Sequence, residues 1–130
     1  MYKLKKEFKI CCSHRLHDKT ISEEENKEVF GRCNNLPSHG HNYLITLYLK
    51  SPVLINGMIL NFNAIKEIFQ EKIDDRFDHR FLNDDELFKD IVSSAENMSK
   101  IFFDLLKTEL RTLYKVEIEE TNGASASWEE

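Results

Sequence analysis

The sequence predicts an α+β domain in which helices pack on one face of an antiparallel sheet. Two observations support this fold class: three stretches alternate between apolar and polar residues, and two others carry apolar residues at helical spacing. The chain has 130 residues, of which 41% are hydrophobic, and it contains no repeat and no linker rich in proline or glycine. A single domain over residues 1–130 is therefore expected.

The expected strands follow from alternation, because side chains along a strand point to opposite faces with a period of two. Residues 4–14 form the first strand and residues 41–50 the second, while Asn56-Gly57 marks a tight turn before a short third strand at 58–62. Residues 116–121 form the last strand. The faces with apolar residues carry Phe8, Ile10, Cys12 and His14 in the first strand, Tyr43, Ile45, Leu47 and Leu49 in the second, and Val116, Ile118 and Glu120 in the last.

The expected helices begin at capping-box spacings or show one apolar face. Ser22 precedes three glutamates and predicts a short helix that ends near Phe30. Residues 64–76 predict a second helix. The most clearly amphipathic stretch follows Ser93, whose spacing to Glu96 is that of a capping box. Its apolar residues share one helical face: Met98, Ile101, Phe102, Leu105, Leu106 and Leu110.

Composition and charge narrow the class of function. The 18 basic and 23 acidic residues give a net charge of −5 and are spread along the chain, with no basic stripe for nucleic acid. No apolar run approaches the ~20 residues that cross a bilayer, and the N-terminal residues lack the apolar core of a signal peptide. Three cysteines, two of them adjacent, make a poor disulfide framework. We therefore expect a cytoplasmic protein with no nucleic-acid and no membrane partner.

Three histidines give the strongest indication of chemistry. His39 and His41 form a His-x-His pair, which on an extended strand directs both imidazoles to one face. His14 lies at the apolar end of the first strand and can contribute a third nitrogen. Three protein ligands with an open fourth position are typical of catalytic zinc, although imidazoles also bind copper, nickel and iron. A single histidine is more often a partly buried residue that bonds the backbone, which is our interpretation of His17.

Three further features could take part in chemistry. Cys33 lies in a polar loop beside Arg32, whose charge favours a thiolate, so Cys33 is either a fourth metal ligand or a base or nucleophile. Asp78 precedes His79, and a carboxylate can orient an imidazole for proton transfer, although such a pair alone also fits an ordinary polar loop. Glu120 shares a face with apolar residues. It either accepts N–H groups of a ligand or lies outside the sheet, because an unpaired buried carboxylate is costly.

These features occur together, and in the same order, in a known family. The matching segments extend along nearly the whole chain: Ser13 to Leu16, Glu24 to Asn26, Phe30 to Asn35, His39 to Tyr43, Gly57-Met58 with Asn61, Asp78-His79, Val92 to Asn97, and Tyr114 to Thr121. On these motifs the chain resembles the 6-pyruvoyl-tetrahydropterin synthase family. The resemblance implies the tunnelling fold, a four-stranded antiparallel sheet with two helices on one face. It also implies that three subunits close a twelve-stranded barrel and that two trimers form a homohexamer with active sites shared between subunits.

The resemblance further implies a zinc-dependent enzyme, a carbon–oxygen lyase acting on phosphates. Its substrate would be 7,8-dihydroneopterin triphosphate, and 6-pyruvoyl-tetrahydropterin would form by triphosphate elimination and internal redox, without nicotinamide or flavin. By this resemblance His14, His39 and His41 bind Zn²⁺, Cys33, Asp78 and His79 are catalytic, and Glu120, Glu96 and Thr121 bind the pterin substrate.

Two alternative functions stay open. The related 6-carboxy-tetrahydropterin synthases of the queuosine (7-deazaguanine) pathway act on the same substrate but release acetaldehyde. Five residues separate Cys33 from His39, and Asn61 stands where those enzymes tend to carry aspartate, so both features favour the pyruvoyl product. A zinc- or pterin-binding protein without turnover is the other alternative. The presence of Cys33, Asp78, His79 and Glu120 argues against it. The chain departs from the family pattern in the loop 36–38 and at Ala95, which bear on substrate affinity.

Overall fold

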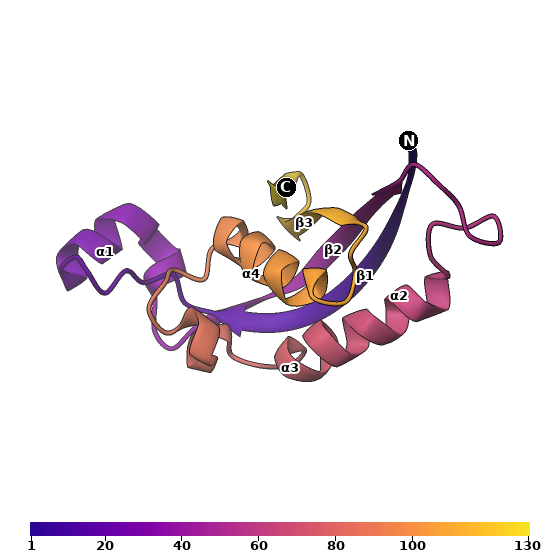
Figure 1. The fold of residues 1–130 in the computed structure, drawn as a ribbon. Coiled ribbons are helices and arrows are strands. Elements are labelled where there is room, and N and C mark those ends of the chain that lie inside the picture. The colour runs from indigo at the N-terminus through magenta and orange to yellow at the C-terminus, as the bar shows by residue number, and fades with distance from the viewer.

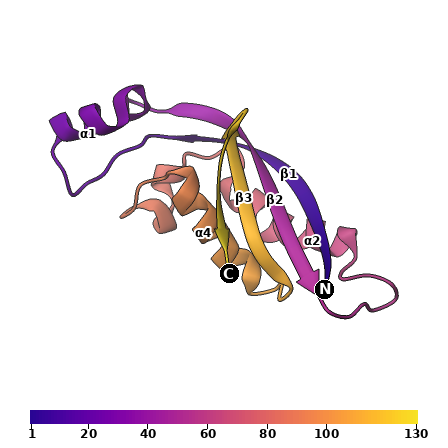
Figure 2. The ribbon, with the colours of Figure 1, turned by 90° about the horizontal axis from the view of Figure 1, so that it is seen from above.

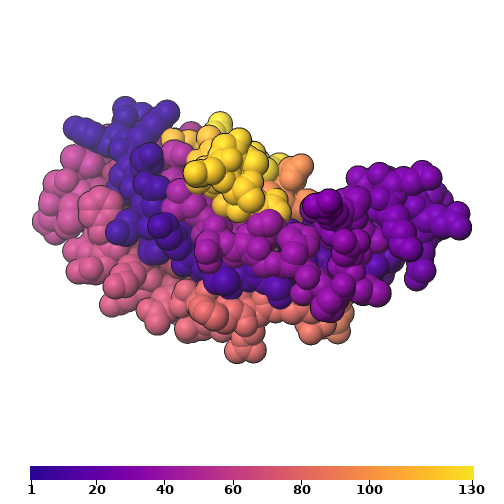
Figure 3. Space-filling model, turned by 180° about the vertical axis from the view of Figure 1, so that it is seen from behind, coloured from indigo at the N-terminus to yellow at the C-terminus, as the bar shows by residue number.

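The computed structural model describes all 130 residues, and its sheet has four antiparallel strands in the order β1-β2-β3-β4. The strands are β1 (Tyr2–His14), β2 (His39–Ser51), β3 (Leu113–Thr121) and β4 (Ala124–Glu129). Seen from behind, β1, β2 and the C-terminal residues lie at the surface of the molecule (Figure 3). The expected α+β class with a four-stranded antiparallel sheet is therefore confirmed.

The helices lie along one face of the curved sheet, and α1 projects beyond its end (Figures 1 and 2). They are α1 (Glu23–Phe30), α2 (Phe62–Phe69), α3 (Asp75–Phe77) and α4 (Ala95–Lys107). A π-helical turn at Gln70–Asp74 joins α2 to α3, and short 3₁₀ helices occur at Gly31–Asn34, Leu82–Asp84 and Glu86–Phe88. No helix combines the length and the apolar character needed to cross a bilayer.

The register between β1 and β2 positions the functional end of the sheet. The pairing runs without a bulge from Tyr2 opposite Ser51 to His14 opposite His39. A slip by one residue would turn every side chain of the strand to the other face. With the observed register, the predicted apolar faces are buried: Ile10, Cys12, Tyr43, Ile45, Leu47 and Leu49. The same register places His14 beside His39 where the sheet ends.

The prediction of a third strand at residues 58–62 is wrong. Only an isolated bridge between Ile55 and Met58 spans the turn at Asn56 and Gly57, which both have positive φ angles of 53° and 76°. The turn is therefore present, but its two arms are too short to form strands. The fourth strand is β4, which follows a turn that includes Gly123 with φ 81°, a conformation that glycine adopts without strain.

Two helix starts differ from their prediction because different side chains cap them. Asn61 accepts a hydrogen bond from the backbone N–H of Asn63 at 2.7 Å, so α2 begins earlier than expected. In α4 the cap is Ser94, whose hydroxyl accepts from the backbone N–H of Asn97 at 3.2 Å. Ser93, the predicted cap, is instead buried. The short helix α1 is capped by Ser22, as predicted.

Phe77 ends α3 and anchors the segment that follows it to the core. Its side chain is 0% exposed, and its ring centroid lies 4.9 Å from that of Phe102 and 5.9 Å from that of Phe88. We expect Phe77→Ala to lower the free energy of unfolding by about 3–5 kcal/mol, since it removes buried contacts and leaves a cavity. Urea denaturation followed by circular dichroism measures this change.

Phe62→Ala is the matched control, because the Phe62 side chain is 55% exposed at the start of α2. The same substitution there should cost less than about 1 kcal/mol. Equal losses for the two variants would show that Phe77 is not a core anchor.

Candidate metal centre and adjoining cavity

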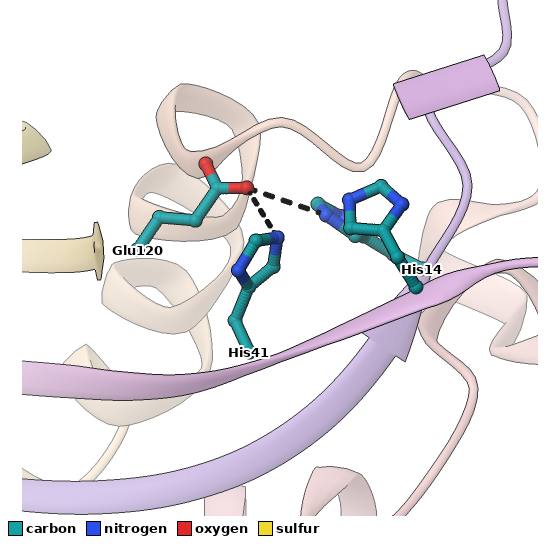
Figure 4. Close-up of side chains that lie close together, drawn as sticks. His14, His41 and Glu120 are labelled. Atoms are coloured by element: carbon teal, nitrogen blue, oxygen red, sulfur yellow. Dashed lines mark ion pairs between the residues drawn. The ribbon is translucent and has the colours of Figure 1, made fainter. Parts of the chain in front are cut away.

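Four side chains from three strands converge at one end of the sheet, and Figure 4 labels three of them. His14 ends β1, His39 and His41 begin β2, and Glu120 lies near the end of β3. Each offers one ligand atom, and these four atoms all lie within 4.8 Å of one another. The structure thus brings the three predicted histidines together and adds the Glu120 carboxylate to them.

Strand pairing explains why these residues meet. His14 is the pairing partner of His39, and His41 follows on the same face of β2. The antiparallel pairing of β2 with β3 sets Leu44 opposite Glu119, so the end of β3 lies beside the start of β2. β3 continues through Thr121, and Glu120 is therefore inside the sheet rather than outside it.

The hydrogen bonds of His14 determine which ring nitrogen is free. His14 is fully buried, and its Nδ1 lies 2.7 Å from the backbone carbonyl oxygen of Ser93. Because a carbonyl can only accept, Nδ1 carries the proton and Nε2 keeps a lone pair, as in many metal-bound histidines. Sequence reasoning missed this role of Ser93, since no local pattern indicates a contact with a residue so distant in the chain.

The other two histidines have buried nitrogens without partners. The Nε2 atoms of His39 and His41 are inaccessible and form no hydrogen bond. His41 Nε2 lies only 2.7 Å from Glu120 Oε1, but a short distance without the correct N–H direction is not a hydrogen bond. Burial lowers the pKa of both imidazoles and His14 lowers them further, while Glu120 raises them in part; the net shift is downward, so the neutral forms are favoured. Buried polar atoms normally have partners, and a cation would supply one to each.

This donor set suits zinc. Imidazole nitrogens and a carboxylate oxygen are usual zinc ligands, and two ligands at about 2.0–2.1 Å from one ion lie roughly 3.4 Å apart. The four atoms, already within 4.8 Å of one another, need only small shifts to reach that spacing. Contact with His14 lowers the pKa of Glu120, although burial opposes this, so its ionised form is favoured. The cluster could therefore bind a metal ion.

Asp78 and His79 are in direct contact and are attached to the outer edge of β1. Asp78 Oδ2 accepts a hydrogen bond from His79 Nδ1 at 2.8 Å, and Asp78 Oδ1 accepts one from the backbone N–H of Cys11 at 2.8 Å. The Cys11 bond, followed by the His79 bond, lowers the pKa of Asp78. His79 adopts an unusual positive φ of 60° and donates its own backbone N–H to the Cys11 carbonyl. The arrangement leaves His79 Nε2 free for proton exchange.

An open cavity of about 590 Å³ adjoins this pair and the metal centre. Four of the predicted site residues line it: Asp78, His79, Glu120 and Thr121. Glu120 is the one residue shared by the cavity lining and the metal centre, and none of the three histidines lines the cavity. Three carboxylates in the lining, with Glu119 as the third, suit a ligand rich in N–H groups.

Two predicted residues belong neither to this cavity nor to the metal centre. Cys33 is half-buried in the 3₁₀ helix Gly31–Asn34, and its carbonyl accepts from the backbone N–H of Leu16 at 2.9 Å. The fourth side chain of the metal centre is Glu120 rather than Cys33, which favours a role for Cys33 other than ligation. Glu96 is exposed in the first turn of α4. The roles of Cys33 and Glu96 stay predictions.

Comparisons with known proteins identify the family of the chain. A family model described as 6-pyruvoyl tetrahydropterin synthase matches residues 3–130. The 6-pyruvoyl tetrahydrobiopterin synthase of Dictyostelium discoideum is 44% identical over 114 residues, which cover 85% of this chain and 83% of that protein. A 6-carboxy-5,6,7,8-tetrahydropterin synthase of Haemophilus influenzae is 31% identical over 90 residues, which cover 65% and 54%. The structure of Caenorhabditis elegans 6-pyruvoyl tetrahydropterin synthase superposes with a TM-score of 0.93 and 36% identity, covering 99% of this chain and 95% of that chain.

Proposed function

The chain belongs to the 6-pyruvoyl tetrahydropterin synthase family, and we propose that it converts 7,8-dihydroneopterin triphosphate to 6-pyruvoyl-tetrahydropterin. The observation that carries this proposal is the three-histidine cluster with Glu120, a residue that also lines the cavity containing Asp78 and His79. A cation site and a proton-transfer pair suit removal of a proton beside a hydroxyl group. Loss of triphosphate without water would make the enzyme a carbon–oxygen lyase acting on phosphates.

We assign Zn²⁺ binding to His14, His39 and His41. The lone pair on His14 Nε2 and the unpartnered nitrogens of His39 and His41 support this assignment. When bound, zinc supplies Lewis acidity that acidifies substrate hydroxyl and adjacent C–H groups. Ser93 fixes the orientation of the His14 ring through its carbonyl oxygen.

We assign proton transfer to Cys33 and to the Asp78–His79 pair. Cys33, as a thiolate, would take the proton from the substrate carbon. His79 Nδ1 carries a proton and donates it in the hydrogen bond to Asp78. The His79 side chain is 79% exposed, so its Nε2 can accept and return protons. Cys33 does not line the cavity that holds this pair in its own chain. An active site that combines groups from neighbouring subunits would unite them.

We assign the pterin ring to the cavity beside Glu120 and Thr121. Figure 4 shows one Glu120 carboxylate oxygen directed at the imidazoles and the other directed away from them. A carboxylate can accept the paired N–H donors of a pterin amino group and ring nitrogen. Glu96 is assigned to substrate binding by family resemblance, and its exposed position on α4 would require a substrate held across a subunit boundary.

We also propose a cytoplasmic homohexamer of two trimers, each closing a twelve-stranded barrel. The sheet ends at β1 and β4, so two strand edges are available for pairing. The β1 edge is covered near its end, where Cys11 and Ser13 contact residues 78–81. Unpaired edges tend to pair with other strands, and barrel closure removes them. The three cysteines are all free, which fits a reducing compartment.

The second candidate function is that of a 6-carboxy-tetrahydropterin synthase, which the relative from Haemophilus influenzae favours. The two functions share the substrate and differ in the product. Two sequence features support the pyruvoyl product: five residues separate Cys33 from His39, and Asn61 stands where the 6-carboxy enzymes tend to carry aspartate. Asn61 caps α2, so its side chain also has a structural role.

We expect the zinc-loaded chain to convert 7,8-dihydroneopterin triphosphate to a product with the mass of 6-pyruvoyl-tetrahydropterin, together with free triphosphate. Mass spectrometry resolves the products, and a reaction without protein is the control. A 6-carboxy product with acetaldehyde would establish the second function instead. Absence of turnover in a chain that binds zinc and retains the pterin would contradict both functions and indicate a binding protein.

A further inference from the structure

A second pocket, of about 320 Å³, lies between the segment after His14, the loop before His39 and residues 81–91. We call it the basic pocket, because its lining contains no carboxylate and four basic residues: Arg15, His17, Lys19 and Lys89. This lining is unusual in a chain with a net charge of −5. It also contrasts with the larger cavity, which is lined by three carboxylates.

A buried asparagine holds two of the basic groups in place. Asn34 is only 3% exposed, and its backbone carbonyl accepts from Arg15 Nε at 2.7 Å. Its side-chain Nδ2 donates to the carbonyl of Leu16 at 2.7 Å and to His17 Nδ1 at 3.0 Å. Because an amide nitrogen only donates, His17 Nδ1 is the acceptor, and the ring proton of the neutral histidine is on Nε2. Arg15 likewise has N–H groups that Asn34 does not use, so both residues offer oriented donors.

The two lysines are available to a ligand. Lys89 pairs with Glu86 at 3.1 Å, but the Glu86 side chain is 80% exposed, and ion pairs of this kind contribute little. Lys19 is exposed and forms no ion pair. Further carboxylates lie nearby but outside the lining of the basic pocket. Asp18 and Asp90 line a small adjoining hollow of about 20 Å³ together with Lys19 and Lys89, and the charge of Asp84 also acts on Lys89.

We propose that the basic pocket binds a polyphosphate and, resting on the proposed function, that it receives the triphosphate of the substrate. Guanidinium and ammonium groups are the usual protein partners of phosphate oxygens. The carboxylates of the larger cavity would repel the triphosphate, whereas the basic pocket would attract it.

The order of the sites along the molecule supports this assignment. The larger cavity shares Glu120 with the metal centre, and the lining of the basic pocket includes Arg15, the residue that follows the metal-centre residue His14. Adjacent residues have Cα atoms about 3.8 Å apart, so the basic pocket begins next to the metal centre. The substrate has the matching order, with a hydroxyl-bearing side chain between the ring and the triphosphate.

Calorimetric titration with inorganic tripolyphosphate tests the site itself. The full chain is used free of metal, because tripolyphosphate chelates divalent cations. We expect measurable binding, and we expect Lys19→Gln/Lys89→Gln to raise the Kd about tenfold or more. The control is Lys27→Gln/Lys66→Gln, which changes the net charge equally at two exposed lysines outside the basic pocket. Failure of the unmodified chain to bind, or equal effects of the two double variants, would overturn the proposal.

Steady-state kinetics of the zinc-loaded chain test the assignment to the substrate. We expect Lys19→Gln/Lys89→Gln to raise KM for 7,8-dihydroneopterin triphosphate about tenfold with little change in kcat, because uniform binding is lost. Its affinity for 7,8-dihydroneopterin, which lacks phosphate, should not change. An unchanged KM alongside weakened tripolyphosphate binding would overturn the assignment to the substrate. A chain that binds tripolyphosphate as expected but has no turnover would contradict the proposed function and support the basic pocket.

Discussion

Replacing Cys33 with alanine is expected to lower kcat of the zinc-loaded chain about 10²–10⁴-fold, the usual contribution of a positioned acid or base. The alanine side chain has no group that can accept the substrate proton. Cys33 is half-buried and is not a member of the metal cluster, so zinc content and stability should change little. Rapid-quench kinetics with product analysis measure the rate, and atomic absorption measures the zinc content.

Two further variants make this result specific. Cys33→Ser preserves the size of the side chain but ionises far less readily than a thiol, and it should lose as much activity as Cys33→Ala. Val29→Ala lies in the neighbouring helix α1, where the side chain is 65% exposed, and should retain normal rates. If kcat of Cys33→Ala equals that of the unmodified chain, Cys33 is not the base. The Asp78–His79 pair would then be the only assigned proton acceptor.

Replacing His41 with alanine is expected to abolish stoichiometric zinc binding and, with it, turnover. The variant removes one of the three nitrogen ligands, so the ligand set is incomplete and the buried Nε2 of His39 stays without a partner. Loss of a residue that only orients a zinc ligand lowers zinc affinity roughly 10–100-fold. Loss of the ligand itself should lower it further. In the unmodified chain, zinc at 1,000 times its Kd should add about 4.1 kcal/mol to stability. Chelator competition and thermal melts with and without zinc measure both effects.

His17→Ala is the matched control for zinc content. His17 is held by Asn34 and is outside the metal cluster, so this variant should keep one zinc ion per chain and the zinc-dependent rise in melting temperature. Full zinc occupancy in His41→Ala would show that the ion binds elsewhere. Removal of zinc from the unmodified chain by a chelator should stop turnover, and added zinc should restore it.

Features that depend on neighbouring residues were predictable. Alternation identified the buried faces of β1, β2 and β3, and it placed His14 and the His-x-His pair on those faces. The cap at Ser22 was also correct, because a capping hydrogen bond spans only a few residues. The third strand at 58–62 was wrong because alternation over so few residues carries little information.

The helix cap before α4 shows where local information ends. The serine pair at 93 and 94 offers two candidate caps. In the structure Ser94 caps α4, and the carbonyl oxygen of Ser93 accepts a hydrogen bond from His14. The hydroxyl of Ser93 is also within hydrogen-bonding distance of Arg15 and Asn83, at 3.4 and 3.3 Å. These partners lie on other segments, so the spacing of residues around Ser93 could not indicate them.

Strand periodicity and residue type therefore established the fold class, the buried faces and the three histidines of the metal centre from local patterns alone. Packing decided the rest: that Glu120 joins the histidines, that Asp78 bonds both His79 and the edge of β1, and that four basic residues meet in one pocket. The reason is physical. Side-chain direction along a strand follows from the backbone geometry of a few residues, whereas each of these contacts joins segments far apart in the chain and forms only when the sheet and its loops are assembled.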